Sequence, residues 1–275
     1  MNILAILDTP DSSVSIPKIA MLCVAAAMAG IVNSIAGGGT LLTFPALTWV
    51  LGPSAAAAVI ANATSTIAVF PGSVASTWGY RRELVGMKSW ILPLIIPSLV
   101  GSAIGTCLVA QRDPKEFLFL VPWLILMATS LFLLQPAITK WTGIGQPHAT
   151  PSRLARYGIM SFQFLIAFYG GYFGAGIGIL MLSSLALMGI SDIHRMNSIK
   201  TLLASTINSV SVGLFIWYDK VNWSLAIPMI VASITGGFFG AVVARRLNKN
   251  IVRYIVITIG IVLSSYYFIR VYRGL

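Results

Sequence analysis

The feature that most constrains this chain is the length of its uncharged stretches. Residues 19–80 contain no Lys, Arg, Asp or Glu. As helix, at about 1.5 Å per residue, such a stretch could cross a hydrocarbon layer of roughly 30 Å about three times. Only 9% of the whole sequence is charged, against about 25% in soluble domains. The predicted fold class is therefore an all-α polytopic membrane protein.

The apolar runs and the turn residues between them predict ten helical segments. Two of them, 40–51 and 177–190, measure only about 18 and 21 Å at the helical rise, which is too short to cross the membrane alone. Each is the second segment in a group of five, and whether it crosses or re-enters stays open. The full set is 17–36, 40–51, 55–78, 90–110, 117–135, 154–173, 177–190, 197–218, 223–244 and 251–270.

The recurrence of this segment plan predicts two inverted repeats of about five helical segments each, with a short half-helix second in each. At an offset of 138 residues, Gly38 corresponds to Gly176 and Tyr80 to Tyr218. Each group makes an odd number of crossings, so the two run in opposite senses, as in many secondary transporters. The expected division is a lead-in at 1–16, a first transmembrane repeat at 17–135, a cytoplasmic linker at 136–153 and a second repeat at 154–275.

The basic residues predict how the chain is oriented. Loops on the side of the linker contain 12 Lys and Arg, and those on the side of the two termini contain 6. The positive-inside rule then places the linker in the cytoplasm and both termini outside. The net charge of +11 is explained by these same basic loops, which are expected to contact the head groups of the lipid bilayer. No nucleic-acid partner is expected.

Three consecutive glycines at 37–39 directly precede the first short segment. If that segment is a half-helix, the turn before it lies at membrane depth and must be shielded by protein or line a watery cavity. A helix N-terminus has unsatisfied N–H donors and a partial positive charge, which suits an anion. We expect the glycines to expose such donors, with hydroxyl and amide groups beside them. The candidate ligands here are Asn33, Ser34, Gly37, Gly38, Gly39 and Thr40.

The second short segment follows a glycine-rich run at 170–178, and a polar stripe follows each short segment. Two half-helices that point at each other near the midplane would form one anion site. Alternatives stay open: the glycines allow close helix packing, the polar side chains bond to neighbouring helices, and Lys200 snorkels to the cytoplasmic surface. The candidate ligands here are Asn62, Ser65, Gly174, Gly176, Gly178, Lys200, Thr201 and Asn208.

The sequence lacks the residues that several classes of membrane protein require. No Asp or Glu falls inside a predicted span, and both histidines lie in loops, so neither a carboxylate proton relay nor an intramembrane protease is expected. No nucleotide-binding motif is present, and we expect no enzyme activity, cofactor or metal. Cys23 and Cys107 fall inside spans and are expected to be free. The GxxxG pairs at 101–105 and 236–240 are interpreted as packing contacts.

Two motifs resemble a known family. Residues 33–42, NSIAGGGTLL, followed by Pro45, resemble the first signature of the sulfite exporter TauE/SafE family. The run GAGIG at 174–178, followed by Asn197, Lys200 and Thr201, resembles the second, although Ile177 interrupts its glycines. The likeness covers nearly the whole chain after residue 16. It implies a bacterial inner-membrane permease for sulfite, sulfonates or related sulfur anions.

The leading hypothesis is a passive or weakly coupled exporter of a small sulfur-containing anion. Import instead of export shares the same architecture and stays open. A non-transporting membrane partner of a sulfur-metabolism enzyme is a further alternative, but it would not need the polar groups that this chain carries near the membrane centre. The sequence also leaves open whether the protein is a homo-oligomer.

Overall fold

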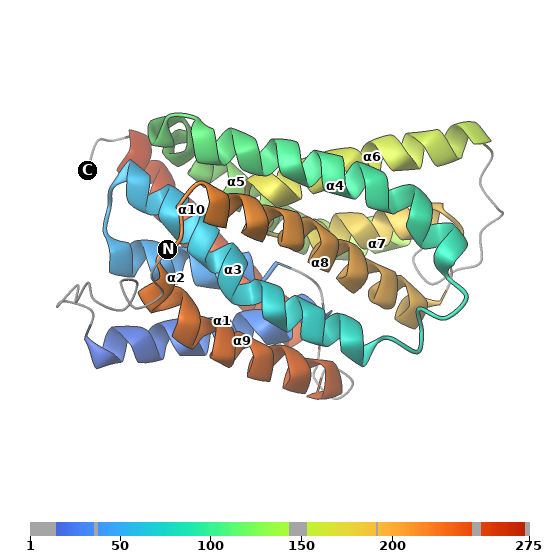
Figure 1. Cartoon of the computed structure of the whole chain (residues 1–275), viewed down its shortest axis with the longest axis horizontal. Helices are drawn as coiled ribbons and strands as arrows, with labels where there is room; N and C mark the ends of the chain where they lie inside the picture. The colour runs from blue at the N-terminus through green and yellow to red at the C-terminus, as the bar shows by residue number, and fades with distance from the viewer. Residues whose placement is uncertain (1–14, 36–37, 143–152, 191, 244–248, 273–275) are drawn as a thin grey trace.

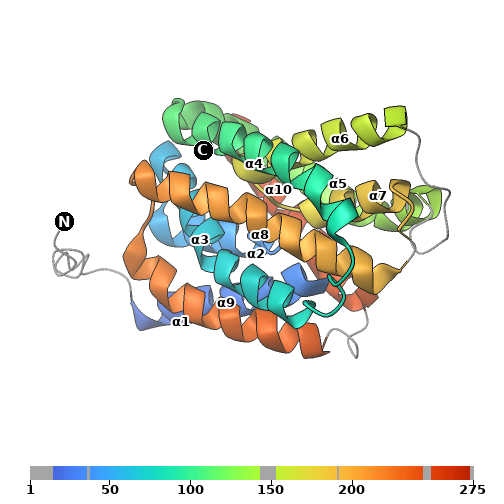
Figure 2. The same cartoon turned by 45° about the vertical axis from the view of Figure 1, so that its right-hand side comes forward.

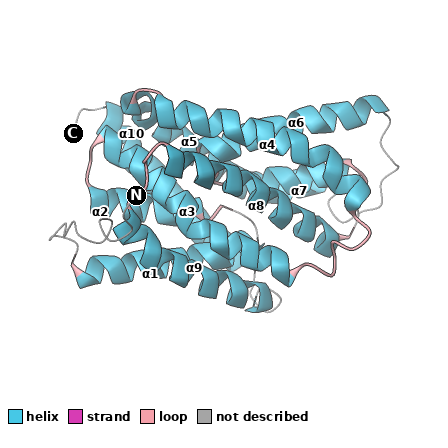
Figure 3. Cartoon of the chain, in the orientation of Figure 1, coloured by secondary structure: helices cyan, strands magenta, loops and turns pink. Residues whose placement is uncertain are grey.

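The computed structural model describes residues 15–35, 38–142, 153–190, 192–243 and 249–272, which form ten helices and no strand (Figure 3). Six helices are long and apolar enough to cross a membrane, which agrees with the predicted polytopic fold. The helices are α1 (Ile16–Ile35), α2 (Thr40–Leu51), α3 (Ala55–Gly79), α4 (Lys88–Gln111), α5 (Pro114–Thr142), α6 (Arg153–Tyr172), α7 (Ile177–Leu187), α8 (Ile193–Trp217), α9 (Trp223–Val243) and α10 (Lys249–Tyr272).

Two helices extend four or more residues beyond a predicted bound. Helix α5 continues to Thr142, so residues 136–142, which we assigned to the linker, are helical. Ile138 packs against the buried core there, and a proline at 136 removes only one backbone donor. Helix α8 begins at Ile193, four residues early, because the Asp192 carboxylate accepts hydrogen bonds from the first backbone N–H groups and caps the helix.

Each short helix runs back toward the end of the bundle at which the helix before it begins. Helix α1 starts at the left end of the bundle in Figure 1, and α2 runs back to that end. Lys18, in the first turn of α1, lies with its Nζ 6.0 Å from the ring centroid of Trp49 near the end of α2. Helices α6 and α7 form the corresponding pair from the other end of the bundle (Figures 1 and 2).

Helices from the first group of five pack mainly against helices from the second. Helix α1 packs on α9, α4 on α6 and α8, α3 on α8 and α9, and α5 on α10. A Cβ placed on Gly236 would lie 2.0 Å from the carbonyl oxygen of Ala27, and one on Gly105 would lie 2.1 Å from that of Phe168. Only glycine permits such an approach, so the packing interpretation is confirmed for Gly101, Gly105 and Gly236. The surroundings of Gly240 lie outside what the structure describes.

One of two buried hydrophobic clusters surrounds the short helix α2, and the other includes the short helix α7. The ring of Phe44 is fully buried and packs edge-to-face on Phe173, with 5.2 Å between centroids. It also contacts Phe117 of α5 and Tyr267 of α10. Aromatic packing of this kind fixes a helix that is too short to be held by its own backbone bonds. Cys23 and Cys107 are both free thiols, as expected.

Candidate functional site

The turns that precede α2 and α7 meet inside the bundle. A Cβ on Gly38 would lie 2.9 Å from the backbone nitrogen of Gly176, and one on Gly174 would lie 3.9 Å from the Thr40 hydroxyl oxygen. Gly38, Gly174 and Gly176 have φ angles of +113°, +82° and +77°, in the region that side chains disfavour. The turns therefore favour glycine at all three positions, and the contact between the turns requires it at Gly38.

The first turn is held by the side chain of Asn33, from the last turns of α1. Its Oδ1 accepts hydrogen bonds from the backbone nitrogens of Gly38 at 2.9 Å and Gly39 at 2.7 Å. Our expectation that these two amides face an anion directly is wrong, because buried backbone donors require a partner and Asn33 already supplies it. Gly37 and the side chain of Ser34 lie outside the described residues.

The second turn is held by different groups. The hydroxyl of Tyr169 in α6 donates a hydrogen bond of 2.8 Å to the carbonyl of Ala175. Asn62 in α3 donates a bond of 3.0 Å from Nδ2 to the carbonyl of Tyr172 at the end of α6. Asn62 was predicted as an anion ligand, but the structure uses it to fasten the segment that leads into the turn.

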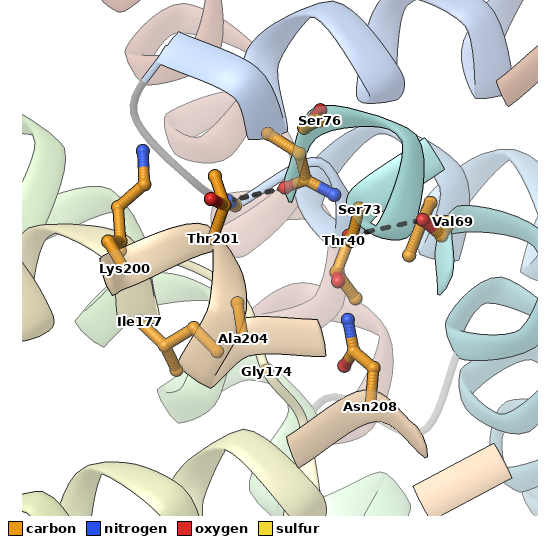
Figure 4. Close-up of a pocket in the computed structure, with 13 residues that line it drawn as sticks. Thr40, Val69, Ser73, Ser76, Gly174, Ile177, Lys200, Thr201, Ala204 and Asn208 are labelled. Carbon is orange, nitrogen blue, oxygen red and sulfur yellow. Dashed lines mark hydrogen bonds between the residues drawn. The ribbon is translucent and has the colours of Figure 1, made fainter. Parts of the chain in front are cut away.

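A small cavity of about 30 Å³ lies where the two turns meet. It is bounded by the end of α1, the starts of α2 and α7, and one face each of α3 and α8 (Figure 4). The residues that line it are Asn33, Gly38, Thr40, Val69, Ser73, Ser76, Gly174, Ile177, Gly178, Lys200, Thr201, Ala204 and Asn208.

The structure brings most of the predicted site residues to this cavity, but not all of them. Asn33, Gly38, Thr40, Gly174, Gly178, Lys200, Thr201 and Asn208 line it. Four other predicted ligands do not. A Cβ on Gly39 would clash with Ala29 and one on Gly176 would touch Ala128, Asn62 bonds α6, and the hydroxyl of Ser65 lies 2.5 Å from that of Thr43. For Asn62 and Ser65, the alternative of bonds between neighbouring helices holds.

The sequence analysis did not assign five lining residues to the site. Val69, Ser73 and Ser76 follow one another at helical spacing on α3, so they share a face. Ser73 lies near one face of the third predicted segment together with Asn62 and Ser65, so the sequence did indicate a polar face there. The apolar or small residues around Ser73 gave no reason to include this part of the segment in the predicted site. Ile177 and Ala204 complete the lining with apolar surface.

Lys200 is the single charged residue in the described lining of the cavity. Its side chain is only 1% exposed, so the snorkelling alternative is wrong: the side chain stays within the protein. In Figure 4 it lies beside Thr201, with its ammonium end at one edge of the group and Asn208 further along α8. A buried cation and several polar groups, with no carboxylate among the described lining residues, favour a negatively charged or strongly polar ligand.

The chain matches one protein family and several relatives with similar descriptions. Residues 22–267 match the family described as Sulfite exporter TauE/SafE. A probable membrane transporter protein of Haemophilus influenzae is 27% identical over 259 residues, which is 92% of this chain and 95% of that protein. The probable membrane transporter protein YfcA of Escherichia coli K12 is 28% identical over 242 residues, or 87% of this chain and 86% of that protein.

A further relative is the probable membrane transporter protein YunE of Bacillus subtilis 168. It is 28% identical over 265 residues, covering 87% of this chain and 95% of that protein. No solved structure matches the chain at a comparable level of significance.

Proposed function

Because the chain belongs to the sulfite exporter TauE/SafE family and its relatives are membrane transporters, we propose that it exports a small sulfur-containing anion, such as sulfite or an organosulfonate, across the bacterial inner membrane. The observation that carries the proposal is the burial of Lys200 in a cavity whose described lining contains no carboxylate. A fixed positive charge in a low-dielectric site attracts an anion strongly and excludes cations.

The packing of the helices supports two inverted repeats. If α1 to α5 are exchanged with α6 to α10, the pair α1 and α9 becomes α6 and α4, and the pair α3 and α9 becomes α8 and α4; all four pairs are in contact. The pairs α3 with α8 and α5 with α10 map onto themselves. The two re-entrant hairpins also enter from opposite ends (Figure 1), as an inverted repeat requires.

The predicted orientation becomes part of the proposal. The start of α1 and the end of α10 lie at one end of the bundle, and the end of α5 and start of α6 lie at the other (Figure 1). Together with the 12-to-6 distribution of Lys and Arg, this arrangement favours a cytoplasmic linker at 136–153 and both termini outside. An impermeant thiol reagent would react from outside with a cysteine introduced beyond Tyr272 and not with one introduced between Thr142 and Arg153.

The cavity corresponds to a closed conformation. One water needs roughly 10–15 Å³ by this measure, so about 30 Å³ holds about two waters. A sulfur oxyanion has four or more heavy atoms and needs more space. Substrate passage therefore requires the two turns to separate at the contact between Gly38 and Gly176, with each hairpin moving as part of its own repeat.

The proposed export needs no coupled ion. Moving one negative charge out of a cell whose interior is negative releases about 2.3 kcal/mol per 100 mV, which exceeds the roughly 1.4 kcal/mol of a tenfold concentration gradient. No Asp or Glu occurs in the described lining of the cavity, so a carboxylate proton carrier is not provided there. We infer uncoupled, electrogenic transport.

The test is solute flux in proteoliposomes with an imposed membrane potential, comparing the anions sulfite, sulfate and thiosulfate with taurine, which has no net charge near neutral pH. Flux of the anions should follow the potential and be indifferent to a pH or sodium gradient once substrate ionisation is controlled. Lys200→Gln should lower the flux at least about tenfold, or about 1.4 kcal/mol, whereas Lys220→Gln, in the loop between α8 and α9, should not. Absence of flux for every anion would favour the non-transporting alternative, and a strict requirement for either gradient would reveal a coupling site.

A further inference from the structure

The side chain of Asn33 is locked in one orientation by the backbone that it supports. A side-chain amide has one acceptor oxygen and one NH₂ group. The oxygen accepts the N–H groups of Gly38 and Gly39 at 2.9 and 2.7 Å. Only the Nδ2 group is then left for the cavity that Asn33 lines, and no residue described in the structure accepts a hydrogen bond from it.

Reversing this amide would be costly. A flipped Asn33 would point its NH₂ group at two backbone donors, and the N–H groups of Gly38 and Gly39 would lose their acceptor. Buried donors without a partner are strongly disfavoured. The turn thus keeps the donor side of Asn33 directed at the cavity, whatever solute is present there.

The other amide on the lining, Asn208, has no such restraint. No hydrogen bond of its side chain to a described residue is present, and in Figure 4 it lies across from Thr40 with its nitrogen toward that residue. It is free to turn and offer either a donor or an acceptor. Of the two lining amides, only Asn33 has a fixed hydrogen-bonding character.

We propose that Asn33 is a specificity-determining residue whose Nδ2 donates a hydrogen bond to an oxygen of the transported anion. Lys200 selects the sign of the charge, and Asn33 adds a donor that cannot become an acceptor, so solutes that offer only N–H or O–H donors are rejected at this position. The inference rests on the proposed function, because it assumes that the anion passes through this cavity.

The decisive variant is Asn33→Asp, which has nearly the same shape. One carboxylate oxygen keeps the two bonds to Gly38 and Gly39, while the other replaces the donor with a negative acceptor. Asn33→Ala removes both functions. In detergent, the unfolding midpoint of Asn33→Asp should exceed that of Asn33→Ala, because only the former retains an acceptor for the turn.

Flux measurements distinguish a role of Asn33 in binding the anion from a role in supporting the turn alone. With methanesulfonate, whose charge is constant between acidic and neutral pH, Asn33→Asp should show at least about tenfold lower flux than wild type at neutral pH. Its flux should recover as the introduced carboxylate is protonated in acid and regains an O–H donor, whereas wild-type flux should not rise. The control Lys220→Gln, in the loop between α8 and α9 and outside the lining of the cavity, should change the flux less than threefold at either pH.

Two results would overturn the proposal. Asn33→Asp could carry the anion as fast as wild type at neutral pH, or it could remain inactive throughout the acidic range while still folded. Either would leave the proposed function intact, because the wild-type protein would still transport. If the wild type itself moved no anion, the proposed function would fail, and this inference with it.

Discussion

The turns before α2 and α7 occupy equivalent places in the fold but are held by opposite hydrogen-bonding chemistry. In the first turn, a side-chain acceptor, the Asn33 oxygen, holds two backbone N–H groups. In the second, a side-chain donor, the Tyr169 hydroxyl, holds a backbone carbonyl at Ala175. The first arrangement leaves an amide donor for the cavity, whereas the second uses a phenol that is not among the cavity-lining residues.

This difference indicates that the two halves of the molecule contribute different kinds of groups to the cavity. The first turn contributes polar groups at Asn33 and Thr40, and the second contributes glycine and isoleucine surface at Gly174, Ile177 and Gly178. The charge comes from Lys200, one helix further on. The interrupted glycines of the second motif are consistent with this division, since that turn supplies shape more than hydrogen bonds.

The largest effect is expected at the contact between the turns. In Gly38→Ala the new Cβ would lie 2.8 Å from the Phe132 ring and 2.9 Å from the Gly176 nitrogen, at a φ of +113°. Backbone strain of about 1–3 kcal/mol and overpacking of about 1–3 kcal/mol should together lower the free energy of unfolding and abolish transport. Gly38→Leu should lose transport while still inserting into the membrane.

The matched control is Gly86→Ala. Gly86 has a φ of +80° but nothing within 4 Å of its Cβ position, so it reports the cost of backbone strain alone. Unfolding in detergent and flux in proteoliposomes should both be much closer to wild type than for Gly38→Ala. Equal behaviour of the two variants would show that the turns do not press against each other as described.

An intermediate effect is expected for Tyr169→Phe. The substitution removes the hydroxyl that bonds the Ala175 carbonyl at 2.8 Å but keeps the ring. Leaving a buried carbonyl without its partner costs about 1–3 kcal/mol, which should appear as a lower unfolding midpoint. Because the hydroxyl does not reach the cavity lining, the apparent substrate affinity should change little. A large loss of affinity without loss of stability would mean that the second turn takes part in recognition after all.

The sequence predicted the helices well because their positions follow from the uncharged runs and from the thickness of the membrane. Long uncharged runs fix helices, and the two short segments were identified because about 18 Å of helix cannot span the bilayer. Helix ends were less certain. The cap at Asp192 depends on two hydrogen bonds from backbone nitrogens to its carboxylate. The extension of α5 past Pro136 depends on core contacts with other helices, and periodicity reveals neither.

The sequence predicted which residues lie at the candidate site better than it predicted the hydrogen bonds that they make. Glycine runs and polar residues identified Asn33, Gly38, Lys200 and Asn208 as members of one site, because the two short helices were expected to point at each other near the membrane centre. The partners of each polar group were not predictable. Asn33 bonds backbone five and six residues away, within a local turn whose shape periodicity does not reveal. Asn62 bonds a carbonyl 110 residues away, so its role follows from tertiary packing.

The smallest effect is expected for Gly176→Ala, and it tests the comparison most directly. Gly176 corresponds to Gly38 in the predicted repeat, yet its Cβ position is 3.6 Å from Ala128 and Leu131, which is ordinary van der Waals contact. Only the φ of +77° opposes a side chain, at about 1–2 kcal/mol, so this variant should unfold slightly earlier than wild type and retain most of its flux. Damage equal to that of Gly38→Ala would mean that the two turns are functionally equivalent and that the unequal division between the halves is wrong. Flux close to wild type would instead locate the critical contact on the first turn, where Phe132 and the Gly176 nitrogen leave no room for a methyl group.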